Sequence, residues 1–255
     1  MPKACNQVWT IDFKGHFRTA DGRLCYPLTV RDLHSRFVLA IIVLLDPSEK
    51  TVKKALVRVF RRWGLPEIFR VDNGAPFGSC GPRGLTTLSV WWLRLGIGVE
   101  FTGRARPQDN AAHEQMHRVL KAETASPPGA HPQAQQRRFQ RWIACYNYLR
   151  PHESLGQKPP ATCYHRSQRP WPAALADWSY GKSWPRRRIH SKGLLSWQGR
   201  RRNIGRAFTG EWIGLKPLSA GVWRVYLGKY LLGTLHAVDA AGLRPVQLLA
   251  NRKKC

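Results

Sequence analysis

The stretch VWTIDF, residues 8–13, places a single carboxylate, Asp12, among large apolar and β-branched side chains. This composition favours a buried β-strand. A carboxylate inside such a strand costs several kcal/mol unless it is hydrogen-bonded, paired with a base or bound to a metal ion. Asp12 is therefore expected either to form a buried salt bridge or to serve a function.

A second acid follows a short apolar run further along the chain. Residues 68–71 (IFRV) predict a buried strand, and it ends directly in Asp72-Asn73-Gly74. A side chain at the carboxyl end of a strand projects from the sheet edge, where α/β proteins commonly bind ligands. An Asx turn formed with Asn73 and Gly74 is the alternative interpretation of Asp72.

Hydrophobic patterning around these two acids predicts a mixed α/β domain. The expected strands are 8–13, 24–30, 37–45, 68–71 and 98–102. A helix is expected to begin after Pro47-Ser48, with its apolar side chains on one stripe, and to end at Gly64. Further helices are expected at 86–95, 111–123 and 133–149.

The C-terminal part has a different pattern of short Trp- and Val-containing runs separated by Gly. Five strands are expected there, at 194–197, 201–204, 212–218, 222–227 and 230–238. Such a series is typical of a small all-β barrel. The sequence therefore predicts a catalytic-type α/β domain over 1–163, a basic Pro-, Trp- and Arg-rich linker over 164–192, and a small β-barrel over 193–255.

Composition points to a folded protein with a polyanionic partner. The 255 residues carry 42 Lys and Arg against 15 Asp and Glu, a formal charge of +27, with 43% hydrophobic residues and 11 Trp. That apolar content excludes a wholly disordered basic tail. No apolar run approaches the ~20 residues of a membrane-spanning helix, and no signal segment opens the chain. We therefore expect a cytoplasmic protein.

Three segments containing acids resemble the motifs of a known family. WTIDFKG (9–15), VDNGAPF (71–77) and QDNAAHEQMHRVLKAE (108–123) are similar to the three motifs of DDE transposases with a retroviral-integrase-like core, especially those of bacterial insertion sequences. The resemblance extends from residue 7 through PHESL (151–155) to Ala161. It implies a ribonuclease H-like mixed sheet with flanking helices, followed by a small SH3-like barrel.

The resemblance also implies a mechanism and a set of partners. Asp12, Asp72 and Glu114 would be the catalytic residues and the ligands of two Mg²⁺ or Mn²⁺ ions. Two such ions, roughly 4 Å apart, stabilise the attacking and leaving oxygens of an in-line phosphoryl transfer. Water or a DNA 3′-hydroxyl would be the nucleophile. Lys121, two helical turns after Glu114, and the neighbouring Arg118 would contact DNA, and the enzyme would act as a nucleoid-associated homo-oligomer.

A basic segment spans the predicted linker and the first barrel strands. Eight positive charges and no acid fall within residues 186–206, with Trp197 among them. So many like charges repel one another unless a polyanion is present, so contact with the DNA backbone is expected. The residues expected to make it are Arg186, Arg187, Arg188, Lys192, Arg200, Arg201 and Arg202.

Some features depart from the family pattern. The segment between the second and third acids is lengthened by a glycine-rich loop at 78–84, and Ala111 and Gln115 replace a Gly and an Arg common in the third motif. Family members usually carry an N-terminal helix-turn-helix region, whereas Met1 comes only eleven residues before Asp12. A truncated or alternatively started chain is therefore expected.

Two other functions are compatible with parts of the sequence. His113-Glu114-Gln115-Met116-His117 is a literal H-E-x-x-H, the zinc-binding pattern of a metalloprotease. A third zinc ligand is poorly supplied, and Asp12, Asp72 and the charge of +27 would then be unexplained. A non-catalytic DNA-binding remnant of a transposase would keep the fold and the charge. The presence of all three acids favours the enzyme.

Overall fold

The computed structural model of the protein describes residues 2–102, 111–239 and 241–246, and within 111–114 it describes only the backbone. The chain divides into two compact units, each built from two segments. Unit 1 comprises Met1–Asp72 and Gly96–Ala173, and unit 2 comprises Asn73–Leu95 and Ala174–Cys255.

Unit 1 is built on a mixed sheet in the order β4-β3-β1-β5-β6, with β2 also paired to β3. Strands β1, β3 and β4 are antiparallel, whereas β1, β5 and β6 are parallel. The expected mixed α/β fold is confirmed. The strands are β1 (Val8–Phe13), β2 (Phe17–Arg18), β3 (Leu24–Asp32), β4 (Val38–Leu44), β5 (Ile68–Val71) and β6 (Gly98–Phe101).

One face of this sheet is covered by α1 (Glu49–Trp63). Trp9 of β1 packs on Phe60 of that helix and on Phe69 of β5, with ring centroids 6.4 and 6.2 Å apart. As expected, the helix begins after Ser48, whose side chain accepts the Thr51 N–H, and ends at Gly64. The left-handed backbone at the latter position, with φ +81°, explains why a glycine stands there.

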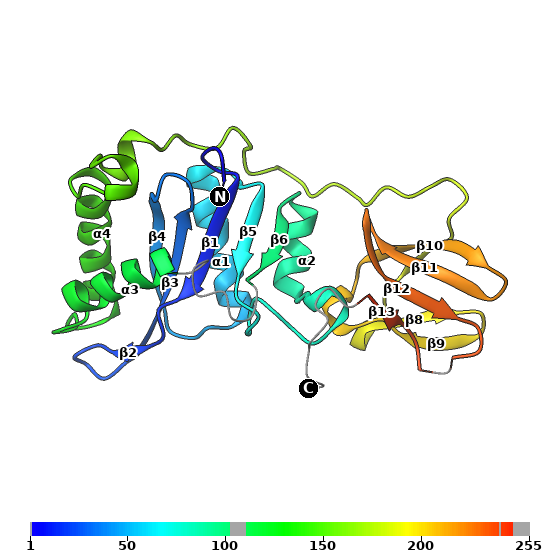
Figure 1. Ribbon diagram of the computed structural model, residues 1–255. Coiled ribbons are helices and arrows are strands. Elements are labelled where there is room, and N and C mark those ends of the chain that lie inside the picture. The colour runs from blue at the N-terminus through cyan, green and yellow to red at the C-terminus, as the bar shows by residue number, and fades with distance from the viewer. Residues whose placement is uncertain (1, 103–110, 240, 247–255) are drawn as a thin grey trace. The chain divides into compact units, whose positions relative to one another are not determined.

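The opposite face carries α3 (Ala111–Thr124) and α4 (Pro132–Tyr148), which lie together beside the sheet (Figure 1). Their apolar side chains pack over β3 and β4 in one core. That core contains Cys25, Val38, Ile41, Met116, Leu120, Phe139, Trp142 and Tyr146. Residues of β3 that alternate with the α1-facing ones, such as Thr29 and Arg31, therefore point towards α3 and α4.

Unit 2 contains α2 (Thr87–Arg94) and seven of the described strands. Five form an antiparallel sheet in the order β13-β12-β11-β10-β7, and β8 pairs with β9. The five predicted strands are present, and closure into an SH3-like barrel stays a prediction. The strands are β7 (Arg186–Arg188), β8 (Leu194–Trp197), β9 (Arg200–Asn203), β10 (Trp212–Ser219), β11 (Val222–Leu227), β12 (Tyr230–His236) and β13 (Arg244–Pro245).

The segment predicted as a linker, 164–192, contains one strand, β7, that the sequence pattern did not predict. Arg186–Arg188 forms an edge strand that pairs with β10, with Arg188 opposite Trp212. Just before it, the Tyr180 hydroxyl donates to the Trp212 carbonyl at 2.6 Å. Aromatic side chains that pack on a sheet bury enough surface to order the segment that carries them. The sequence pattern by itself predicts only a connection there. None of the helices in the described ranges is long and apolar enough to cross a membrane.

Candidate active site and nucleic-acid surface

Two of the three predicted acids come from neighbouring strands of unit 1. The parallel ladder between β1 and β5 ends with Thr10 opposite Arg70, and Asp12 and Asp72 each follow two residues later. Neighbouring strands lie about 4.8 Å apart, so the same register brings the two acids to adjacent positions at the carboxyl ends of the strands. The Asp12 side chain is 35% exposed and Asp72 is exposed, so a ligand can reach both.

Asp12 accepts one hydrogen bond through its carboxylate and one through its backbone carbonyl. Its Oδ1 accepts the Phe13 N–H at 2.8 Å. Its carbonyl oxygen accepts the Thr29 hydroxyl at 3.0 Å, across the antiparallel β1–β3 pair. The same hydroxyl lies 2.9 Å from Nε2 of His117 on α3. These contacts tie the acid, the neighbouring strand and the helix together.

The protonation of His117 follows from this arrangement. Burial, reinforced by the positive charges of Lys14 and Arg31, lowers the pKa of His117 to about 3, so its imidazole is neutral at pH 7. Because the single hydroxyl proton of Thr29 goes to the Asp12 carbonyl, Thr29 accepts the proton on Nε2. Nδ1 then carries the lone pair, 3.9 Å from Oδ2 of Asp12. The contact is therefore not an ion pair.

The donor set at this edge suits a divalent cation. Two carboxylates supply the hard oxygen ligands that Mg²⁺ and Mn²⁺ prefer. Oδ2 of Asp12 lies 3.9 Å from Nδ1 of the neutral His117 imidazole, so no positive side chain neutralises this carboxylate through that contact, and Asp12 would supply an oxygen ligand to a cation. Among the residues with described side chains, no three His, Cys, Asp or Glu gather in one cluster. The side chain of Glu114, the third predicted ligand, lies outside the described residues.

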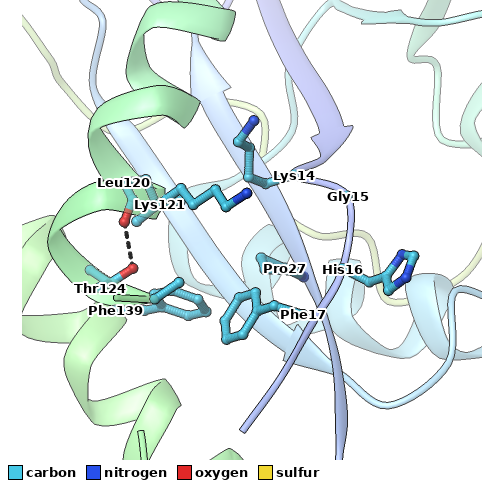
Figure 2. Close-up of a pocket in the computed structure, with 10 residues that line it drawn as sticks. Lys14, Gly15, His16, Phe17, Pro27, Leu120, Lys121, Thr124 and Phe139 are labelled. Atoms are coloured by element: carbon cyan, nitrogen blue, oxygen red, sulfur yellow. Dashed lines mark hydrogen bonds between the residues drawn. The ribbon is translucent and has the colours of Figure 1, made fainter. Parts of the chain in front are cut away.

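A basic pocket of about 180 Å³ opens next to Asp12, between the end of β1 and helices α3 and α4. Figure 2 shows the amino groups of Lys14 and Lys121 on one side of it and the rings of Phe17 and Phe139 on the other. No acid lines it. The pocket thus combines two cations with an apolar wall, which suits a phosphate and a sugar or base.

A second, more open basic hollow of about 520 Å³ adjoins the first. Lys14 and Lys121 line both, and Arg118 and Ser126 complete the outer one. Lys121 and Arg118 are exposed on α3, as a DNA-contacting role requires. Arg118 lies four residues after Glu114 in the sequence and Lys121 seven, so these positions follow one face of the helix.

Six of the seven basic residues predicted in unit 2 are exposed: Arg186, Arg187, Arg188, Lys192, Arg200 and Arg201. The Arg187 guanidinium lies over the Trp197 ring, 5.3 Å from its centroid. Arg202 does not fit the prediction, because it is 2% exposed and donates to the Ala237 carbonyl at 3.1 Å. Because Arg202 is buried, it does not belong to the exposed basic surface of unit 2.

Sequence reasoning missed three residues beside Asp12, namely Thr29, His117 as a neutral partner, and Lys14. Only Lys14 could have been predicted from the sequence, since it is a base two residues after Asp12, directly beyond the end of β1. The other two meet Asp12 through strand register and helix docking. His117 was considered as a zinc ligand, but its Nε2 is engaged with Thr29. The other predicted zinc ligand, His113, has a side chain outside the described residues.

Comparison with known protein families matches most of the chain. Models described as integrase core domain match residues 2–107 and 95–160. The model of the IS481 family transposase C-terminal domain matches residues 186–238. Integrase core matches therefore cover both Asp12 and Asp72 and the whole of α3 and α4, and the transposase match covers β7 to β12.

Individual relatives agree with these matches. An uncharacterized 31.7 kDa protein of insertion element IS407 from Burkholderia multivorans is 29% identical over 180 residues, 69% of this chain and 62% of that protein. The Gag-Pol polyprotein of baboon endogenous virus is 32% identical over 116 residues, 44% of this chain and 6% of the polyprotein. The chain thus spans less than two thirds of these relatives.

A solved structure supports the fold. A chain of the simian T-cell lymphotropic virus intasome, in complex with PP2A regulatory subunit B56 gamma, aligns with a TM-score of 0.53 and 18% identity. The alignment covers 93% of this chain and 81% of that one. At this identity the likeness concerns the fold alone.

Proposed function

Because the chain carries an integrase core domain followed by a transposase C-terminal domain, we propose that it is a DNA transposase that cuts and joins DNA strands. The observation that carries the proposal is the pairing of Asp12 and Asp72 at the ends of neighbouring parallel strands. Two acids in so basic a protein, both open to solvent at one sheet edge, supply what a metal-dependent phosphoryl transfer needs.

Asp12, Asp72 and Glu114 would hold two Mg²⁺ or Mn²⁺ ions. When bound, the ions would stabilise charge on the attacking and leaving oxygens of the phosphate being cut. The protein's own part is to fix the ligands. The Thr29 hydroxyl fixes the Asp12 backbone, and His117 in turn holds Thr29, while its neutral imidazole adds no charge that would compete with a cation. Water would be the nucleophile for cutting and a 3′-hydroxyl for joining.

The basic groups beside the acids would hold the DNA strand. Lys14 and Lys121, which line both basic hollows, would bind a backbone phosphate next to the cut, and Arg118, which lines the outer hollow, would bind the strand further along α3. The exposed cations of unit 2, such as Arg186 and Lys192, would bind the backbone without reading sequence. Joining two element ends to a target needs two active sites, so the protein would act as a homo-oligomer on DNA.

The test is cutting and joining of a branched DNA substrate by the purified protein in Mg²⁺ or Mn²⁺, compared with Asp72→Asn and Glu114→Gln. A branched substrate reduces the need to recognise an element end. We expect products only with metal, and none from either variant. The matched control is Asp46→Asn, which removes an exposed acid before α1 and should leave the yield unchanged.

Two results would contradict the proposal. Salt-sensitive DNA binding without products under any of these conditions would favour a non-catalytic remnant of a transposase. Stoichiometric zinc in the purified protein, with Asp72→Asn fully active, would instead revive the metalloprotease based on the HEQMH motif.

A further inference from the structure

Another basic pocket lies on the other side of α3 from the two basic hollows described above. It has a volume of about 330 Å³ and is bounded by the end of β3, by α3 and by the segment that follows α4. Val119 lines it, whereas Lys121, two residues later, lines the first pocket. Two residues correspond to about 200° around a helix, so the two pockets face opposite ways.

Three guanidinium groups line this pocket, those of Arg31, Arg36 and Arg150. Arg31 is 1% exposed. Burial lowers its pKa, and the neighbouring charge of Arg36 lowers it further. It is also hydrogen-bonded to Tyr146. A buried cation beside two like charges is costly, and an anion between them would remove that cost.

The nearby acids offset this charge only in part. Glu123 pairs with Arg150, at 2.8 Å between Nη2 and Oε1. Asp32 follows Arg31, but its carboxylate accepts hydrogen bonds from the Asn6 N–H and from Ser35. The acid that lines the pocket, Glu153, is exposed. The wall therefore keeps a positive excess.

His152 adds a buried polar nitrogen to the same wall. Its ring meets the Tyr146 ring at 4.7 Å in an edge-to-face contact. Its Nε2 is buried and has no hydrogen-bond partner among the residues that the structure describes. Leaving such an atom buried and unpaired is unfavourable. An oxygen of a bound anion would pair with it when Nε2 carries the proton.

We propose that this pocket binds a backbone phosphate of DNA, distinct from the phosphate at the acids. Guanidinium groups suit phosphate because they form bidentate, charge-assisted hydrogen bonds. The choice of DNA as the source of the phosphate rests on the proposed function. Since the pocket opens on the opposite face of α3, it would engage a different stretch of DNA from the strand being cut.

The experiment measures DNA affinity against salt concentration for Arg36→Gln, because Arg36 is partly exposed and its loss should leave the core intact. All proteins carry Asp72→Asn, so no DNA is cut during the measurement. Losing one phosphate contact should reduce the slope of log K against log salt by about 0.9. Arg36→Lys should restore part of the slope. Arg58→Gln, which removes an exposed charge from α1, is the matched control.

A second measurement identifies the bound group. Duplexes that carry a single uncharged methylphosphonate at successive positions should show a position that weakens binding by the Asp72→Asn protein but not by the same protein with Arg36→Gln. Equal slopes for Arg36→Gln and Arg58→Gln would overturn the proposal. So would stabilisation of the fold by inorganic phosphate through Arg36 with no change in the DNA slope, which would assign the pocket to a free anion.

These results separate the pocket from the proposed function. If the wild-type chain cuts no DNA but Arg36→Gln still reduces the slope of log K against log salt, the phosphate-binding pocket is supported and the transposase activity is rejected. If cutting depends on Asp72 and the slope is unchanged, the reverse holds.

Discussion

The two units of the molecule handle charge in opposite ways. In unit 1 a few acids stand at fixed places, and Asp12 is held by a strand neighbour and a helix. In unit 2 the notable groups are exposed arginines such as Arg186 and Arg187 on an edge strand, where their positions matter less than their number. Chemistry needs geometry fixed to a fraction of an ångström, whereas attraction to a polyanion adds up over many loose contacts.

The largest effect that this contrast predicts is on Asp12. Asp12→Asn should reduce cutting and joining by about a thousandfold or more, because several kcal/mol of transition-state stabilisation depend on the ligand. DNA affinity should stay within about threefold of wild type, since one neutralised acid hardly changes so large a charge. Product yield and filter binding on the same DNA measure the two. A variant that lost both equally would mean that the acid supports the fold rather than the chemistry.

The opposite result is expected from the arginines of β7. Replacing Arg186, Arg187 and Arg188 together by Gln should weaken DNA binding about a hundredfold at moderate salt and reduce the salt slope by about 2.7. Each single change should cost about tenfold or less. The yield from DNA at saturating concentration should be nearly unchanged. Loss of product at saturating DNA would show that these residues position the strand and do not merely attract it.

A smaller loss of activity is expected when His117 is replaced, because this residue is not proposed to contact DNA. His117→Asn should lower the rate about tenfold to a hundredfold, the usual cost of losing a group that orients a metal ligand. Thr29→Val should behave similarly, because it breaks the same chain of hydrogen bonds. The double variant should lose little more than either single one. Additive losses of rate in the double variant would contradict a shared role. A second measurement, independent of activity, is the Mn²⁺ concentration that gives half of the maximal thermal stabilisation of each variant.

Features that depend on residues close together in the sequence could be predicted, whereas features that depend on strand register or helix docking could not. Asp12 and Asp72 were predictable because each lies within or directly after a short apolar strand. The Thr29–His117 contact was not, because it depends on the β1–β3 register and on how α3 docks. Strand β7 was missed because three arginines show no alternation of apolar and polar residues. Burial of Arg202 could not be predicted, since only the folded sheet shows what covers it.

A change in the packing of unit 2 should lower the stability of the protein. A methyl group at Gly214 would overlap the Tyr180 ring, which packs on that strand. Gly214→Ala should therefore destabilise the protein by about 1–3 kcal/mol. Ser219→Ala, on the exposed end of the same strand, should cost under about 0.5 kcal/mol. Urea unfolding followed by Trp fluorescence measures both. An unchanged stability for Gly214→Ala would mean that Tyr180 does not pack there in solution.

The smallest predicted effect tests whether α3 and α4 stay packed on the sheet and keep Cys25 away from solvent. Cys25 is fully buried there, and burial raises the pKa of its thiol to about 12. The unfolded thiol ionises near pH 8.5, so above that pH the unfolded state loses a proton that the folded state keeps. Stability should fall as pH rises, by about 1–2 kcal/mol at pH 10, and Cys25→Ala should lack this component.

Thiol labelling at pH 9 gives the same test without unfolding. The exposed Cys145 should react at once and Cys25 only when the fold opens. Equal labelling rates would show that α3 lifts from the sheet on the timescale of the reaction. His117 would then be free of Thr29 for part of the time, and a preformed site at Asp12 would no longer distinguish unit 1 from the loosely placed charges of unit 2.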